Sequence, residues 1–84
     1  MESYPGLKQG HIVAMVDEDG LVVELEDGAH FRVYSGFQPV SARWQPEHMI
    51  RVKANPKNPE HPYKLINIHL NQEVEAYWLG NPGN

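Results

Sequence analysis

Residues 12–34, IVAMVDEDGLVVELEDGAHFRVY, decide the fold of this chain. They contain three alternating apolar runs separated by two Asp-Gly pairs, Asp19-Gly20 and Asp27-Gly28. Asp-Gly between alternating apolar residues is the strongest short-range signal for a β-hairpin, because both residues tolerate the positive φ that hairpin turns require. The stretch therefore predicts a three-stranded antiparallel meander at the start of an all-β domain.

The second hairpin can be assigned to its register. A three-residue loop, Glu26-Asp27-Gly28, with Gly28 in the left-handed region as a G1 bulge, places apolar residues opposite apolar residues. A two-residue loop would pair each apolar residue with a polar one. The core face of the hairpin is then Leu21, Val23, Leu25, Ala29, Phe31 and Val33. The outer face is Val22, Glu24, His30, Arg32 and Tyr34, and it places His30 opposite Glu24.

The first hairpin has two possible loops, because both faces of its first strand are apolar. A four-residue loop at 17–20 turns three residues of that strand toward the core: Ile12, Ala14 and Val16. A three-residue loop that starts at Glu18 turns two others inward: Val13 and Met15. We favour the four-residue loop because Ile12 and Val16 supply more branched bulk for a core.

Six short strands are expected along the chain, at about 10–16, 21–26, 29–34, 48–54, 63–69 and 73–79. The strand at 48–54 turns Ile50, Val52 and Ala54 inward and Arg51 and Lys53 outward. No helix is predicted. Six antiparallel strands in 84 residues protect their edges best by closing, so we expect a small antiparallel barrel or roll of five to six strands, SH3-like or OB-like.

The chain is expected to form a single β-barrel domain over residues 10–79. Residues 1–9, which contain Pro5-Gly6, are expected to be a loose N-terminal arm, and residues 80–84 a loose tail. The longest unpatterned segment, 35–47, is expected to pack as an ordered loop because it contains four bulky or rigid residues: Phe37, Pro39, Trp44 and Pro46.

Charge is distributed unevenly along the sequence. The net charge of −4 and the pI near 5.6 disfavour an obligate nucleic-acid binder. Residues 1–30 hold seven acidic residues against one lysine, whereas residues 31–64 hold six basic residues against two acidic ones. This pattern fits ordinary solvated strand faces, and it also fits a dipolar domain whose middle third faces an anionic partner.

The chain contains no cysteine, which excludes disulfides, thiolate metal sites and a cysteine nucleophile. No apolar run reaches the length of a signal peptide or a membrane span. We expect a cytoplasmic protein if Met1 is the natural start, and a periplasmic or secreted one if a leader was removed.

Part of the chain resembles small bacterial all-β domains whose function is not characterised. The resemblance covers about residues 25–67, and its motifs are Asp27-Gly28, Trp44 before Ile50-Arg51-Val52, and YKLIN at 63–67. Such domains usually enter the fourth strand through Gly-Asp, whereas this chain has Pro46-Glu47-His48. The resemblance implies a fold and no established activity. The stretch GLVVELEDGAHFRV also resembles the OB domain of the initiation-factor-one type. That resemblance implies RNA binding on a basic sheet face.

Five residues are the candidate binding site: Arg32, Tyr34, Trp44, Arg51 and Lys53. Aromatic side chains beside cations are typical of surfaces that bind single-stranded nucleic acid or another anionic ligand. Aromatic side chains also cap small barrels with their polar atoms in water. We expect Trp44 to be such a plug, because it stands in a loop between prolines.

Metal binding is not predicted. The five histidines, His11, His30, His48, His61 and His69, show neither helical i, i+4 spacing nor a His-x-His pair. Asp17-Glu18-Asp19 is interpreted as a solvated turn, because an EF-hand loop needs its glycine at the sixth position. Three prolines, Pro56, Pro59 and Pro62, recur with the polyproline II period. They either stiffen a connector or present a docking peptide.

An enzyme is not expected, because nothing places a nucleophile beside a base and no glycine-rich loop precedes a helix. No cofactor is predicted. We expect a non-catalytic β-barrel interaction module that binds a protein or peptide partner. The alternative is a weak binder of single-stranded nucleic acid or anions on the basic and aromatic face of residues 32–64.

Overall fold

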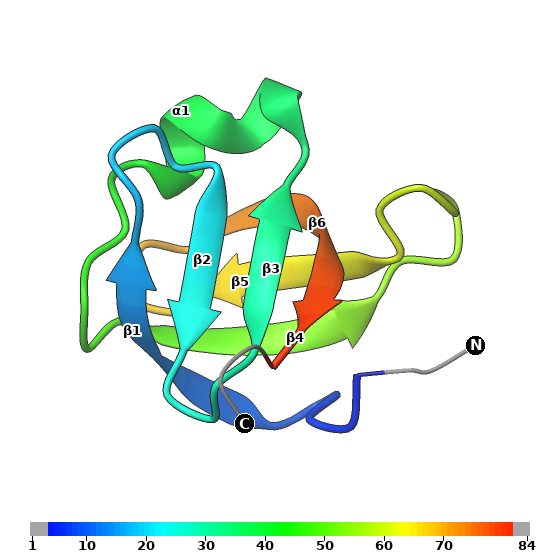
Figure 1. Cartoon of the computed structure of the whole chain (residues 1–84), viewed down its shortest axis with the longest axis horizontal. Helices are drawn as coiled ribbons and strands as arrows, with labels where there is room; N and C mark the ends of the chain where they lie inside the picture. The colour runs from blue at the N-terminus through cyan, green and yellow to red at the C-terminus, as the bar shows by residue number, and fades with distance from the viewer. Residues whose placement is uncertain (1–3, 82–84) are drawn as a thin grey trace.

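The fold is a closed barrel of six antiparallel strands, seen in a computed structural model that describes residues 4–81 (Figure 1). The strands are β1 (Gly10–Val16), β2 (Val22–Leu25), β3 (His30–Val33), β4 (Met49–Ala54), β5 (Tyr63–Asn67) and β6 (Gln72–Gly80). Two short helical turns, η1 (Ser35–Phe37) and α1 (Gln38–Ser41), follow β3. The prediction of a small antiparallel all-β barrel is confirmed.

Two three-stranded meanders, β1–β3 and β4–β6, close onto each other to make this ring. Its order is β1-β2-β3-β6-β5-β4, with β4 returning to β1. The ring pairs β1 with β4 and β3 with β6, and both pairs are antiparallel. Figure 1 shows α1 over one end of the barrel, while the chain leading into β1 runs along the other end.

The second hairpin has the predicted register. Val23 pairs with Phe31 and Glu24 pairs with His30. The Leu25 amide donates to the Ala29 carbonyl at 2.9 Å, and Gly28 has a φ of 91°. His30 Nε2 lies 3.2 Å from Glu24 Oε1, as the cross-strand pairing predicted. The left-handed glycine is confirmed, and so is the core face except at Leu21, which is half-buried and outside the core cluster.

Neither predicted loop of the first hairpin is the observed one. Val16 pairs with Val23, and the Asp17 amide donates to the Val22 carbonyl at 3.2 Å, so the turn consists of residues 18–21. Of the three side chains that the preferred loop turned inward, only Val16 packs against the core. The pairing of β1 with β2 shifts between Val13 and Met15, which marks a β-bulge. Val13 is therefore buried and Ile12 is not, whereas Val16 again packs against the core beyond the bulge. An extra residue in one strand reverses which side chains face inward, so a single alternation cannot describe this strand.

Ala54 is exposed, which corrects its predicted inward position on β4. β4 ends there, and the next residue turns inward in its place. Asn55 is buried, its amide donates to the Pro62 carbonyl at 2.7 Å, and its side-chain Nδ2 donates to the His61 carbonyl at 3.0 Å. These bonds close the connector between β4 and β5.

The 35–47 segment is ordered, but it contains the helical turns that the sequence did not predict. Four residues are too few to show a helical period, and α1 begins with Pro39 in its first turn. Ser41 is buried, and its hydroxyl donates to the Gly20 carbonyl at 2.6 Å, which ties α1 to the β1–β2 turn. The space for this contact exists because Gly20 has no Cβ; an added one would collide with the backbone of Ala42.

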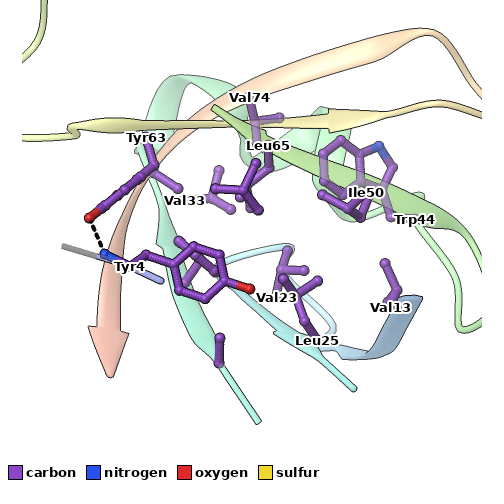
Figure 2. Packing of buried hydrophobic residues seen from close by; sticks show 14 residues of the cluster. Tyr4, Val13, Val23, Leu25, Val33, Trp44, Ile50, Tyr63, Leu65 and Val74 are labelled. Carbon is purple, nitrogen blue, oxygen red and sulfur yellow. Dashed lines mark hydrogen bonds between the residues drawn. The ribbon is translucent and has the colours of Figure 1, made fainter. Parts of the chain in front are cut away.

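The core fills the barrel from both ends. Figure 2 shows Tyr4 and Trp44 at opposite sides of the buried cluster, with the aliphatic side chains between them. Tyr4 is only 2% exposed, although the sequence predicted a loose arm over residues 1–9. Its amide donates to the Tyr63 hydroxyl at 2.7 Å. The outer parts of both predicted loose ends, residues 1–3 and 82–84, lie outside the described residues.

Candidate functional site

The predicted binding residues do not share one face. Arg32 lies on β3 and Tyr34 directly follows it, whereas Arg51 and Lys53 lie on β4. All four side chains are exposed. In the six-strand ring, β3 and β4 are three positions apart in either direction, so they stand on opposite walls of the barrel. The continuous basic and aromatic surface expected over residues 32–64 is therefore divided in two.

Trp44 belongs to neither half, because it is 3% exposed and packs in the core. Its indole N–H donates to Gln72 Oε1 at 3.1 Å. The expectation of a packed plug with a satisfied indole is confirmed. A side chain this buried cannot stack on a ligand without opening the barrel.

The Tyr34 half of the predicted surface holds the connector between β4 and β5. The Tyr34 and His61 rings stack with centroids 4.5 Å apart and planes at 17°. His61 also lies 5.6 Å from the ring of Tyr77 on β6, and Asn58 Nδ2 donates to Glu75 Oε1 at 2.8 Å. These contacts explain the aromatic side chains on this wall without a ligand.

The β4 half of the predicted surface borders an open groove of about 440 Å³. Five residues line the groove: Leu7, Lys8, Arg51, Lys53 and Ala54. The aliphatic side chains give it an apolar floor, and three cations surround that floor. Arg51 and Lys53 point outward because the residues that alternate with them along β4, Ile50 and Val52, are fully buried in the barrel.

The chain segment before β1 forms the second side of the groove. The Lys8 amide donates to the Val52 carbonyl at 2.9 Å, which extends the pairing of β1 with β4 by one bond. Leu7 packs against the core cluster, and the buried Tyr4 anchors the segment three residues earlier. Lys8 has a φ of 68°, a left-handed conformation that costs energy in a residue other than glycine.

The three groove cations have no ion-pair partner among residues 4–81, where the basic side chains near a carboxylate are Lys64 beside Glu73 and two histidines, His11 beside Asp27 and His30 beside Glu24. Lys53 instead pairs across the strands with Lys64, whose ammonium lies 3.3 Å from Glu73 Oε2. Like charges directly opposite each other destabilise a sheet. The groove therefore holds positive charge that the described part of the protein does not neutralise.

Three acidic residues lie on the other side of the barrel. Glu24 is on β2, and Glu26 and Asp27 follow it in the β2–β3 turn. β2 stands opposite β5 in the ring, and β5 is the neighbour of β4. The acidic charge of the second hairpin therefore lies away from the groove, although Glu73 on β6 pairs with Lys64 nearer to it, and Arg32 lies on β3 next to β2.

Within residues 4–81, no group of three His, Cys, Asp or Glu side chains lies close enough to hold a metal ion. The histidines have other partners: His48 Nδ1 lies 3.0 Å from Asn67 Nδ2, and its ring stacks on His69 with centroids 5.5 Å apart. No helix in the same range is long and apolar enough to cross a membrane.

Comparison with protein-family models, with curated proteins and with solved structures finds no match for this chain. The class of the protein accordingly rests on its geometry: a small closed all-β barrel with a cationic groove on one wall.

Sequence reasoning missed three groove residues. It placed Ala54 inward, and it took the segment of Leu7 and Lys8 for a loose arm. One signal was available in Tyr4, a large aromatic side chain just before Pro5-Gly6. Buried aromatic residues contribute much of the stability of small cores, and a turn after Tyr4 directs the chain back along the barrel.

Proposed function

We propose that this protein is a non-catalytic interaction module that binds an acidic segment of a partner protein in the groove beside β4. The observation that carries the proposal is the cluster of Lys8, Arg51 and Lys53 around an apolar floor, without ion-pair partners in residues 4–81. Carboxylates from a partner would supply the missing countercharges. The SH3-like or OB-like subtype of the barrel and a bacterial origin stay predictions.

Two features of the groove cost the free protein stability. Lys53 faces Lys64 across the sheet, where Glu73 pairs with Lys64 alone, and Lys8 takes a backbone conformation in which glycine would be less strained. Strain kept at one surface site supports a functional reason for keeping it. An acidic ligand would supply a countercharge to Lys53 and would bind the side chain of the strained Lys8.

The closed ring restricts how a partner can bind. A partner strand can add only to a sheet edge with free N–H and C=O groups. Because the described strands form a complete ring, their main-chain groups bond to one another. Recognition on the β4 wall therefore depends on side chains, which makes the groove cations the determining groups.

A single-stranded nucleic acid fits the groove less well than an acidic protein segment. Such ligands bind by stacking bases on aromatic rings as well as by phosphate contacts. The groove lining contains no aromatic residue, and the Tyr34–His61 stack lies on the other wall.

Fluorescence anisotropy tests the proposal with two labelled probes, a decaglutamate peptide and a ten-nucleotide single-stranded RNA. We expect the peptide to bind at low salt and more weakly as salt increases. The double variant Arg51→Gln/Lys53→Gln should weaken peptide binding by about tenfold or more. The matched control, Arg32→Gln/Arg43→Gln, removes the same charge from outside the groove and should change binding by less than about twofold.

Equal losses in the two double variants would show attraction by net charge alone and would overturn the groove. Tighter binding of the RNA than of the peptide would favour the nucleic-acid alternative.

A further inference from the structure

The outer wall formed by β1, β4 and β5 changes from apolar to basic along its strands. At one end, Ile12 pairs with Met49, and the Ile68 amide donates to the Met49 carbonyl at 3.0 Å. These three side chains form the apolar row. One pair further along β4, Arg51 lies between Gly10 of β1 and Ile66 of β5.

The other end of the wall is basic. Lys53 pairs with Lys64 of β5, and Lys8 lies on the β1 side, where its amide bonds to Val52. These three side chains form the lysine row. The apolar row and the lysine row thus lie on the same outward face, with Arg51 between them.

The apolar row is open to solvent: Met49 is 38% exposed and Ile68 is 47% exposed. Met49 lies over Gly10, since a Cβ added there would approach Met49 Sδ to 3.1 Å. A methionine that rests on a glycine keeps its rotamer freedom and can adapt to an incoming apolar group. Exposed apolar side chains that border a charged groove are typical of interaction sites.

We propose that the partner segment is amphipathic, with acidic side chains over the lysine row and apolar side chains over the apolar row. This inference rests on the proposed function and extends it from the charged groove to the whole wall. Carboxylates alone would bind weakly, because exposed ion pairs contribute little and are screened by salt. Covering the apolar row adds a contribution that salt does not screen, because it comes from surface removed from water.

The spacing of the rows sets the length of the segment. Met49 and Lys53 are both on β4, four residues apart, which corresponds to about 13 Å at the rise of a strand. An extended peptide covers this distance in about four to five residues. A short extended segment with carboxylates at one end and an aliphatic or aromatic side chain at the other would therefore reach both rows.

Two labelled hexapeptides of equal charge test the inference, Glu-Glu-Glu-Ser-Ser-Ser and Glu-Glu-Glu-Ser-Leu-Phe. We expect the second to bind about tenfold more tightly. The variant Met49→Ser/Ile68→Ser should remove this difference and leave the affinity for the serine-ended peptide within about twofold. Met15→Ser is the control, because Met15 is 57% exposed but pairs with Glu24 on the β2 side.

A second measurement does not depend on a variant folding. In the unaltered protein, the methyl resonances of Met49 and Ile68 should shift with the leucine- and phenylalanine-bearing peptide and stay in place with the serine-ended one. Equal affinities for both peptides, with unmoved methyl resonances, would overturn the amphipathic partner and leave the acidic groove standing. Failure of both peptides to bind would overturn the proposed function as well.

Discussion

The Tyr4 hydroxyl donates a hydrogen bond to the carboxylate of Asp27, which joins the start of the described chain to the turn of the second hairpin. His11 completes the arrangement, with Nε2 2.8 Å from the Gly6 carbonyl and 3.2 Å from the Tyr4 oxygen. Because a carbonyl only accepts, Nε2 carries the proton toward Gly6, and the Tyr4 proton is directed to Asp27. This bond helps to hold the segment that forms one side of the groove, together with the Tyr4–Tyr63 and Lys8–Val52 bonds.

Removing the Tyr4 hydroxyl tests the role of this bond in stability. Tyr4→Phe keeps the ring in the core and takes the donor from a part-buried carboxylate, so unfolding free energy should fall by about 1–3 kcal/mol. Urea denaturation measures the change. An unchanged midpoint would mean that water replaces the hydroxyl at no cost.

Alkaline pH should destabilise the protein through the same group. Burial, followed by the hydrogen bond and charge of Asp27, raises the pKa of Tyr4 above its ordinary value of 10.0. The folded state therefore keeps a proton that the unfolded state loses, so stability is intact below pH 10 and declines above it. The decline is about 1.4 kcal/mol per pH unit from this residue. Urea midpoints of the protein and of Tyr4→Phe, compared between pH 9 and 11, isolate the contribution; parallel curves would contradict it.

Gly28 is the residue that the second hairpin can least replace. Its φ of 91° is strained for any β-branched residue, so Gly28→Val should lower the unfolding free energy by about 1–2 kcal/mol or more. Thermal melts provide the measurement, and Arg32→Ala on the exposed face of the same hairpin is the near-silent control. A melt of Gly28→Val that matches the parent would show that the turn can change its type.

Substitution of Trp44 distinguishes a structural role of this side chain from a binding role. Trp44→Ala leaves a cavity in the core and an unpaired Gln72, so it should cost about 3 kcal/mol in chemical denaturation. The fraction that remains folded should bind decaglutamate normally. An unchanged midpoint with lost binding would contradict the plug.

Substitution of Lys8 should affect the stability of the protein and its binding of the peptide differently. Lys8→Gly relieves a left-handed backbone at the expense of a more flexible unfolded chain, so stability should stay equal or rise by up to about 1 kcal/mol. Decaglutamate binding should weaken because a groove cation is lost. Asn71→Gly is a matched control, since Asn71 also has a positive φ, of 54°, but does not line the groove. A large loss of stability in Lys8→Gly would show that its side chain is structural.

Local patterns predicted the parts of the fold that local chemistry fixes. Asp27-Gly28 and the alternation around Phe31 determined the second hairpin, because only one register pairs apolar residues with apolar residues on one face. The bulge between Val13 and Met15 could not be predicted, since both faces of that strand are apolar and either phase satisfies the sequence. The helical turn at Gln38–Ser41 depends on its contact with Gly20, which is distant in sequence.

The candidate site was predicted only in part. Arg51 and Lys53 were identified by alternation along one strand, and they do border the groove. Their grouping with Arg32 and Tyr34 failed because alternation gives the face of a strand and not its position in a closed ring. Lys8 joined the site through the burial of Tyr4, which depends on residues from the second half of the chain.

The burial of Tyr4 also sets the order in which the molecule can be completed. Its amide binds Tyr63, which lies 59 residues later, and its ring lies 5.5 Å from that of Trp78. Contacts between such distant residues form late, because they close a large loop before they contribute any stability, and they slow folding. During synthesis, the segment with Leu7 and Lys8 leaves the ribosome early but reaches its final position only after β5 and β6 have emerged. A nascent chain should therefore be unable to capture its partner until the barrel is whole.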